Sequence, residues 1–149
     1  MRSTFSVTIR TLVITLFLLS CAFAQEPAQT VRGTWIATAG KATVLHGTWA
    51  GGALPHRPNV AAGTWTLVSA GQVVLQGTWR AEKSDRGWEG YWSGHTAQGQ
   101  SLAGSWGTSF EHWHGRTLQD MLQRTLETEV SGWWQAGRSQ GDWWLKGSR

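Results

Sequence analysis

The densest group of potential metal ligands lies between residues 111 and 114. Glu111, His112 and His114 stand close together there, and in an extended segment both imidazoles would point to the same face. Imidazole nitrogens and carboxylate oxygens can bind zinc or copper. No further ligand clearly accompanies the histidines, so His112 and His114 make an incomplete metal site, and the sequence predicts no cofactor.

The acidic residues form no recognisable catalytic arrangement. The nine Asp and Glu residues fall mostly in predicted turns, on the polar faces of predicted strands or on a predicted helix. No nucleophile elbow, HExxH sequence, phosphate-binding loop or Ser-His-Asp spacing occurs. We therefore expect a protein without enzymatic activity. A small hydrolase whose carboxylates meet only in three dimensions is an alternative that the sequence leaves open.

Tryptophan is the residue type best suited to ligand binding, with 12 copies beside 19 glycines in 149 residues. Six tryptophans recur at regular intervals and could line a ligand cavity or a sugar-stacking face. These six are Trp35, Trp49, Trp65, Trp79, Trp92 and Trp106. Their regular spacing and their glycine partners favour another interpretation, in which the indoles form the hydrophobic core.

Two tryptophan doublets, Trp133-Trp134 and Trp143-Trp144, need a separate explanation. Adjacent side chains of a strand point to opposite faces, so one indole of each doublet should face outward or toward a covering helix. We favour cover by the helix over an exposed aromatic patch. Trp134 and Trp144 join the six regular tryptophans as candidate ligand-binding residues.

The regular tryptophans belong to an internal repeat, which is the strongest signal in the chain. Gly-Thr-Trp occurs four times, and Gly90-Tyr91-Trp92 and Gly104-Ser105-Trp106 are degenerate copies. The copies pair into three units, at residues 33–49, 63–79 and 90–106. Each unit reads Gly-x-Trp, then a turn of small residues, then Leu-x-Gly-x-Trp.

Within each unit the hydrophobic pattern has a period of two, which is typical of half-buried antiparallel strands. Each unit is therefore predicted to be a β-hairpin. Glycine in a strand leaves an open patch, and an indole of a neighbouring strand can cover it. Residues 51–60, which include two prolines, are predicted to form a loop, and residues 83–87 a tight turn.

The period changes at residues 117–130, which are predicted to form an amphipathic helix. Four apolar residues share one face of it: Leu118, Met121, Leu122 and Leu126. Thr117 and Asp120 have the spacing of a capping box. A final hairpin is predicted at 131–147, turning at 138–141. The fold is therefore mainly β, an antiparallel up-and-down meander or eight-stranded barrel of Gly-x-Trp hairpins, with one helix before the last hairpin.

This strand pattern resembles that of the avidin and streptavidin family and, more loosely, that of lipocalin-type barrels. The resemblance lies in Gly33-Thr34-Trp35 and Leu45-His46-Gly47-Thr48-Trp49, and it implies an eight-stranded up-and-down barrel. The biotin pocket of that family needs a set of Asn, Ser, Tyr and Asp groups. This chain has one asparagine, Asn59, and one tyrosine, Tyr91. The resemblance therefore extends to the barrel and not to biotin binding.

Residues 1–24 have the layout of a secretory signal peptide, with a basic start, an apolar run at 11–20 and small residues before Gln25. Cleavage there would leave a short linker at 25–32 and a single domain at 33–149. Leu18-Leu19-Ser20-Cys21 resembles the bacterial lipoprotein box, in which the cysteine carries lipid. Both alternatives predict export, to the periplasm or the cell exterior, or to the outer membrane as a lipoprotein.

The charges exclude one large class of partner. The formal net charge of +4 includes two arginines of the signal region, and the remaining charges are scattered, so we expect no nucleic-acid binding. No second apolar run is long enough for a membrane-spanning helix, so only a lipid on Cys21 would attach the protein to a membrane. We expect a small apolar, aromatic or carbohydrate ligand, or a structural role in the envelope. A small hydrolase or an outer-membrane β-barrel is the alternative.

Overall fold

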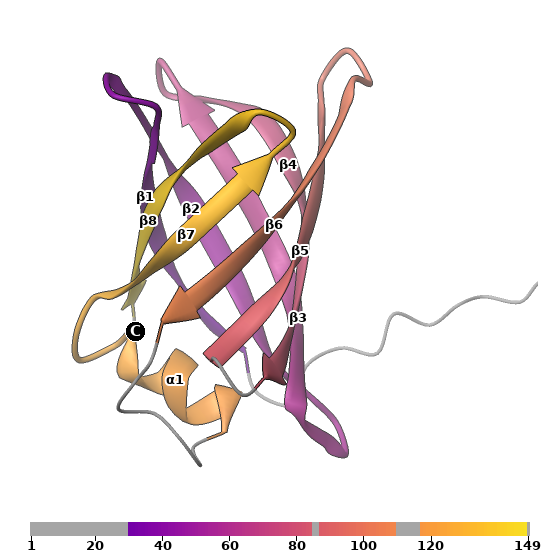
Figure 1. The fold of residues 1–149 in the computed structure, drawn as a ribbon, viewed down its shortest axis with the longest axis vertical. Coiled ribbons are helices and arrows are strands. Elements are labelled where there is room, and N and C mark those ends of the chain that lie inside the picture. The colour runs from indigo at the N-terminus through magenta and orange to yellow at the C-terminus, as the bar shows by residue number, and fades with distance from the viewer. Residues whose placement is uncertain (1–29, 85–86, 110–116, 149) are drawn as a thin grey trace, which may run out of the picture.

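The computed structural model describes residues 30–84, 87–109 and 117–148. The strands are β1 (Val31–Ala39), β2 (Thr43–Leu54), β3 (Arg57–Ser69), β4 (Gln72–Ser84), β5 (Gly87–Thr96), β6 (Ser101–Ser109), β7 (Val130–Ala136) and β8 (Ser139–Ser148). They form a closed antiparallel barrel in which β8 returns to pair with β1, and one helix, α1 (Leu118–Arg124), lies between β6 and β7 (Figure 1). The predicted eight-stranded barrel is therefore confirmed.

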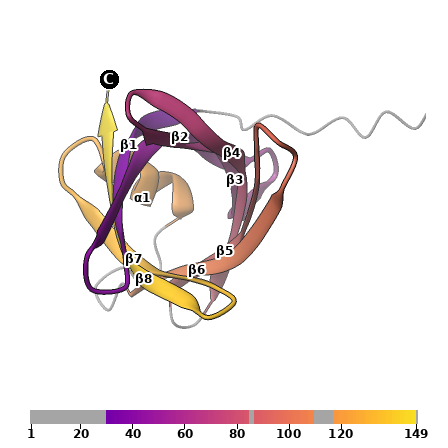
Figure 2. The same ribbon diagram turned by 90° about the horizontal axis from the view of Figure 1, so that it is seen from above.

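The barrel consists of four consecutive hairpins, and its two ends differ. All four hairpin turns lie at one end, which we call the hairpin end (Figure 1). The helix α1 lies at the opposite end, which we call the helix end. Seen from above, α1 falls within the outline of the barrel (Figure 2). Residues 1–24, which were predicted to form a signal peptide, and also His112 and His114 lie outside the described residues.

The strand register places a glycine opposite a tryptophan within every hairpin. In the first hairpin Gly33 pairs with Trp49, and Trp35 pairs with Gly47. The same reciprocal exchange occurs in the other three hairpins. At three junctions between hairpins, tryptophan is paired with tryptophan: Trp49 with Trp65, Trp79 with Trp92, and Trp106 with Trp134. At the fourth junction, between β8 and β1, Trp143 is paired with Ala37 and Trp35 with Leu145. All of these residues share the face that points into the barrel.

The glycines are required because neighbouring rings and main chain leave no room for a Cβ atom. A Cβ at Gly104 would lie 2.7 Å from Cε2 of Trp92. A Cβ at Gly47 would lie 2.9 Å from Cε2 of Trp35 and would collide with the carbonyl oxygen of Thr66. The predicted cover of strand glycines by indoles of neighbouring strands is therefore confirmed at these positions.

Most interior indoles are also bound to the barrel wall through their N–H groups. Trp35 Nε1 donates to the carbonyl oxygens of Thr48 and Thr66, at 3.1 and 3.0 Å. Trp143 Nε1 donates to the carbonyl oxygen of Trp133 at 2.8 Å. The indoles of Trp49, Trp65, Trp79 and Trp134 make the same kind of bond. A buried donor needs such an acceptor, so these bonds fix the orientation of each ring.

The last hairpin is a fourth copy of the repeat, which the sequence prediction did not include. Gly132-Trp133-Trp134 and Gly141-Asp142-Trp143 both read Gly-x-Trp. Gly132 pairs with Trp143, and Trp134 pairs with Gly141, as in the other hairpins. The inward members of the two doublets are therefore Trp134 and Trp143, because each lies two residues after a glycine.

The outward members of the doublets lie on the outer surface of the barrel. Trp133 packs over Gly107 of β6, where an added Cβ would be 2.7 Å from the indole. It stays 38% exposed. The prediction that the helix covers the outward indoles is wrong for Trp133, because α1 closes an end of the barrel and does not pack on the wall.

Strand boundaries differ from prediction at three places. The predicted loop 51–60 is almost entirely strand, because β2 runs to Leu54 and β3 begins at Arg57. A register shift between Ala53 and Leu54 places Pro58, which has no N–H to donate, at an irregular part of the ladder. β1 begins two residues before the predicted position. The last hairpin turns at residues 137–138, where Gly137 has a positive φ of 58°, and not at 138–141.

The helix α1 is shorter than the predicted 117–130, but its start is as expected. The Oγ1 atom of Thr117 accepts the Asp120 N–H at 3.2 Å, and Oδ2 of Asp120 accepts the Thr117 N–H at 3.0 Å. The predicted capping box is therefore confirmed. The helix ends at Thr125, whose carbonyl oxygen accepts the Gly147 N–H of β8 at 2.7 Å. This bond attaches the end of the helix to the barrel wall.

Candidate functional site

The interior of the barrel contains an apolar cavity of about 400 Å³. Eight tryptophans line it: Trp35, Trp49, Trp65, Trp79, Trp92, Trp106, Trp134 and Trp143. The structure therefore brings together seven of the eight tryptophans that the sequence analysis named as candidate ligand-binding residues. These indoles serve as core and as cavity wall at once, because they pack on glycines at one side and leave free space at the barrel axis.

Trp144, the remaining candidate, does not line the cavity. It lies on the outer side of β8, paired with Ile36 of β1 and Ser131 of β7. Its neighbour Trp143 takes the inward position. Ligand binding by Trp144 therefore stays a prediction that the interior cavity does not support, since Gly141 fixes the inward face of β8 at Trp143.

The cavity is closed at the helix end. Met121 and Leu122 of α1 border its floor, and each is only 1% exposed. Around them, Ala61, Ala81 and Trp88 of the strands are also buried. Met121 and Leu122, two members of the apolar face that the sequence placed on the helix, therefore pack into the barrel and border the cavity at this end.

The cavity is open at the hairpin end, where small and aliphatic residues replace the indoles. The lining there comes from Ala37, Leu45, Leu67, Leu75, Leu102 and Ala136. These residues lie within a few positions of the hairpin turns, and Leu102 is 47% exposed.

The indoles are held against one another as well as against glycines. Two chains of edge-to-face contacts run through the cavity wall: Trp35–Trp65–Trp92 and Trp79–Trp106–Trp143. Neighbouring ring centroids in these chains are between 5.5 and 6.2 Å apart. This spacing is within the range that aromatic pairs favour. The wall is therefore preformed, and a ligand would not have to order it.

The cavity offers very few polar groups. No charged side chain lines it among the described residues, and the Ser139 hydroxyl is the polar side chain at its hairpin end. One indole N–H, that of Trp106, is buried without a hydrogen-bond partner in the described part of the chain. The site can therefore hold an apolar molecule, but it has no acid, base or nucleophile with which to transform one.

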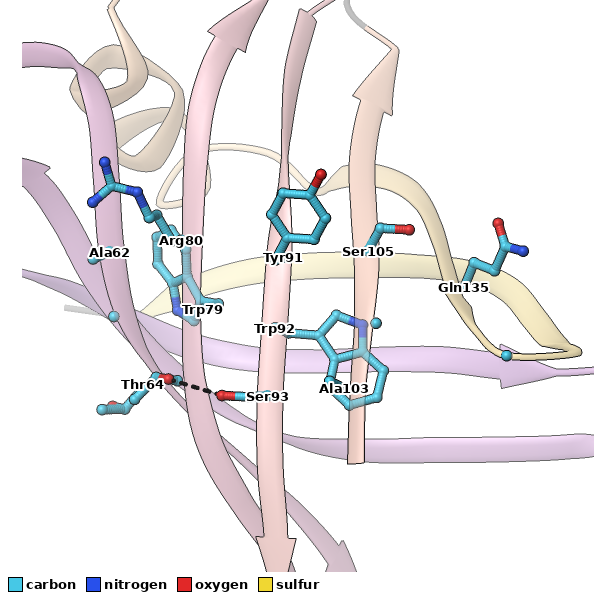
Figure 3. Close-up of a pocket in the computed structure, with 14 residues that line it drawn as sticks. Ala62, Thr64, Trp79, Arg80, Tyr91, Trp92, Ser93, Ala103, Ser105 and Gln135 are labelled. Carbon is cyan, nitrogen blue, oxygen red and sulfur yellow. Dashed lines mark hydrogen bonds between the residues drawn. The ribbon is translucent and has the colours of Figure 1, made fainter. Parts of the chain in front are cut away.

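A second, wider hollow of about 990 Å³ lies on the outer face of the wall (Figure 3). Outward side chains line it in register across four strands, because Arg80 of β4 pairs with Tyr91 of β5, Tyr91 with Ser105 of β6, and Ser105 with Gln135 of β7. A second row includes Thr78 and Ser93, whose hydroxyl oxygens are 3.3 Å apart. Tyr91 is 76% exposed in the middle of this surface.

The interior cavity is the stronger candidate site, although the outer hollow is larger. A ligand in the interior would be surrounded by indoles on several strands and would lose most of its contact with water. A ligand in the outer hollow would keep one side in solvent. Arg80 there already forms a 2.9 Å ion pair with Glu82, and both side chains are exposed. An exposed ion pair of this kind contributes little to the free energy of folding.

Several residues of the cavity were not named as site residues in the sequence analysis. Trp143, Met121 and Leu145 are among them. The Leu-x-Gly-x-Trp pattern contained a usable signal, since Leu45 lies on the same strand face as Gly47 and Trp49. The same spacing places Leu75 and Leu102 inward, so the rim of the cavity could have been read from the repeat.

The other sequence-based expectations concern metals and membranes. Within residues 30–84, 87–109 and 117–148, no group of three His, Cys, Asp or Glu side chains is placed to hold a metal ion. His112 and His114 fall outside these ranges and stay a prediction. None of the helical structure in the described residues is long and apolar enough to cross a membrane.

Comparison with known protein families, with curated proteins and with solved structures finds no match to this chain.

Proposed function

We propose that this protein binds a small apolar molecule inside the barrel, among the tryptophans. The observation that carries the proposal is the cavity of about 400 Å³, which is lined by indoles and aliphatic side chains and bordered by Met121 and Leu122 of the helix at one end. Its volume is at the lower end of the range for small-molecule pockets. Apolar cavities of this kind stay dry and accept apolar guests.

The rigidity of the wall also supports binding. Six of the interior indoles have their N–H groups bound to main-chain carbonyl oxygens, and edge-to-face contacts fix the rings further. Trp35, Trp65 and Trp79 are examples. A preformed site loses little conformational entropy when a ligand enters. The absence of charged lining residues favours an uncharged, mostly hydrocarbon ligand over a sugar or an ion.

The test uses N-phenyl-1-naphthylamine, whose fluorescence rises when it leaves water for an apolar site. We expect saturable binding, with energy transfer from tryptophan to the probe. Leu45→Trp fills the hairpin end of the cavity and should weaken binding by about tenfold or more, equivalent to about 1.4 kcal/mol. Val44→Trp is the matched control, because Val44 is the preceding residue but is 64% exposed on the outer face. Its affinity should equal that of the wild type.

Two results would count against the proposal. The first is the absence of saturable binding by the wild-type protein, which would favour a structural role in which the indoles are core alone. The second is an equal loss of affinity in Leu45→Trp and Val44→Trp, which would place the probe on the outer surface.

We propose carbohydrate binding at the outer hollow as a second candidate function. The observation that favours it is the exposed ring of Tyr91, with Arg80, Ser105 and Gln135 in register beside it (Figure 3). An exposed aromatic ring with polar neighbours can stack on a sugar and bind its hydroxyl groups. Short oligosaccharides of glucose and N-acetylglucosamine should then bind the wild type and not Tyr91→Ala. Equal heats of titration for both proteins would exclude this surface.

We propose export for the location of this activity, as expected from residues 1–24. The mass of the mature N-terminus in the native host tests this directly. Cleavage before Gln25 would give a protein without cysteine, whereas a lipidated Cys21 would give an anchored one. An uncleaved chain beginning at Met1 would contradict both alternatives.

A further inference from the structure

Exposed aliphatic side chains gather at the hairpin end of the barrel. Of the seven large hydrophobic side chains that are exposed in the described part of the chain, four lie at this end: Val44, Val73, Val74 and Leu102. Val44, Val73 and Leu102 each belong to the second residue pair from the turn of their hairpin. Their exposed fractions are 64%, 54% and 47%. Clustered exposed apolar side chains are typical of surfaces that bind a protein or a membrane.

These three aliphatic side chains come from three different hairpins. The turns of β1–β2, β3–β4 and β5–β6 reach farther from the helix end than the turn of β7–β8 does (Figure 1). Leu102 also lines the interior cavity, so the apolar lining continues onto this exposed surface. Separate projecting tips fit a soft apolar phase better than a flat protein surface, because a soft phase can surround each tip independently.

The charged side chains at the hairpin end are all basic. Lys41 and Arg138 are exposed in the turns of β1–β2 and β7–β8, and these two hairpins are neighbours, since the Gly40 N–H donates to the carbonyl oxygen of Gln140 at 3.3 Å. No Asp or Glu lies in the four turns or in the two residue pairs next to each turn. The acidic residues that the structure describes lie on the outer wall or toward the helix end: Glu82, Glu89, Asp120, Glu127, Glu129 and Asp142.

This distribution of charge distinguishes between possible partners. An anionic lipid surface attracts Lys and Arg side chains that are held next to it. The alkyl parts of these side chains can lie on apolar surface while their charged ends stay in water. A second copy of the chain is a poorer partner, because a symmetric contact through this end would bring Lys41 and Arg138 against the same residues of the other copy.

We propose that the hairpin end docks on the surface of an anionic lipid bilayer. Its three aliphatic side chains, Val44, Val73 and Leu102, enter the boundary of the hydrocarbon, and its two basic side chains lie among the phosphate groups. This contact is separate from any lipid on Cys21. It goes beyond the proposed binding function and needs no ligand in the cavity.

The test places an environment-sensitive dye at the proposed contact. A single cysteine is introduced by Val73→Cys in the full chain carrying Cys21→Ser, and it is labelled with NBD, whose emission strengthens and moves to shorter wavelength when it leaves water. We expect both changes when vesicles of phosphatidylcholine and phosphatidylglycerol in equal parts are added. Tyr91→Cys is the matched control, because Tyr91 is 76% exposed but lies on the outer wall, where the label should stay in water.

Residues 1–24 are the same in both labelled proteins, so a difference between the two labels reports which surface of the barrel enters the bilayer. If the protein does not bind the vesicles, or if the label at position 73 stays in water on bound protein, the inference is overturned. Equal changes at positions 73 and 91 would also overturn it. A dimer that shields position 73 without vesicles would assign this end to a second copy instead.

Neutralised variants test the basic part of the surface. Lys41→Gln combined with Arg138→Gln should raise the lipid concentration that gives half of the dye response by about tenfold or more, because each basic side chain near an anionic surface contributes to binding. Arg57→Gln combined with Lys146→Gln is the matched control, since it removes the same charge from exposed positions toward the helix end and should have little effect. Equal weakening by both pairs would mean that net charge alone attracts the protein, contrary to the proposed contact.

A measurement without vesicles separates this inference from the proposed function. Binding of N-phenyl-1-naphthylamine to the same proteins in solution should be unchanged by Lys41→Gln and Arg138→Gln, because neither side chain lines the cavity. Failure of that probe to bind would count against the proposed function alone. Failure of the label at position 73 to leave water would count against docking alone.

Discussion

The inner and outer faces of the barrel wall are made by alternate residues of the same strands, yet they differ in almost every physical respect. On the inner face, each indole of the repeat is placed beside a glycine and held by neighbouring rings. On the outer face, threonine, serine and charged side chains are exposed, and Tyr91 has few neighbours. The comparison indicates that stability resides on the inner face, whereas the outer face can change with little effect on the fold.

The tryptophan doublet of β8 allows the most direct test of whether the inner face contributes more to stability than the outer face. Trp143→Ala removes a buried inward indole and should cost about 3 to 5 kcal/mol of unfolding free energy. Trp144→Ala removes the adjacent outward indole and should cost about 1 kcal/mol or less. Urea denaturation measures both. Equal losses would mean that the two faces contribute alike, contrary to the packing described above.

Glycine on the inner face should be nearly as sensitive as tryptophan. Gly104→Ala would place a methyl group against Cε2 and Cζ2 of Trp92 and against the carbonyl oxygen of Gln135. We expect a destabilisation of about 1 to 3 kcal/mol, as for overpacking elsewhere. Ser105→Ala is the control, one residue later on the outer face of β6. A melting temperature unchanged by Gly104→Ala would show that the indole can move aside.

A substitution at the start of α1 tests whether the stability of the inner face depends on the helix that packs at that end of the barrel. Thr117→Ala removes the capping-box acceptor for the Asp120 N–H and should destabilise the protein by about 1 kcal/mol. Thr128→Ala, beyond the helix and exposed, is the control. Amide exchange should accelerate in α1 more than in the hairpin turns. Uniform acceleration would mean that the helix and barrel unfold only as one unit.

The smallest effect is expected on the outer face. Tyr91→Ala should change the unfolding free energy by no more than about 0.5 kcal/mol, because the side chain is mostly solvated. Binding of N-phenyl-1-naphthylamine should also be unchanged. A larger loss of stability would show that the outer row Arg80, Tyr91 and Ser105 contributes to the fold, and would weaken the contrast between the two faces.

The barrel itself was predictable because each copy of its repeat consists of a glycine and a tryptophan two residues apart on the same strand. Gly-x-Trp on each strand defines which face is inward, and period-two alternation with small-residue turns defines hairpins. The fourth copy was missed for a specific reason. In Gly132-Trp133-Trp134 the middle residue is itself tryptophan, so the doublet concealed the motif, and the short turn at Gly137 shortened the unit.

The cavity was not predictable in the same way. Whether eight indoles fill a barrel or leave space at its axis depends on how the sheet closes into a barrel and on the tilt of its strands. No local sequence pattern indicates either property. The helix was predicted too long because residues 125–130 continue its apolar spacing, although Thr125 ends it and Val130 already belongs to β7.

The pairing of β1 with β8 has a consequence for how the chain could be rearranged. Arg32 pairs with Ser148, so the start of the first strand and the end of the last lie together at the helix end. A short linker could join them, and the chain could then be cut at a connection between two hairpins, such as residues 55–56 between β2 and β3, without separating any paired glycine and tryptophan within a hairpin. The barrel is thus suited to circular permutation, with each hairpin able to stand first in a new order.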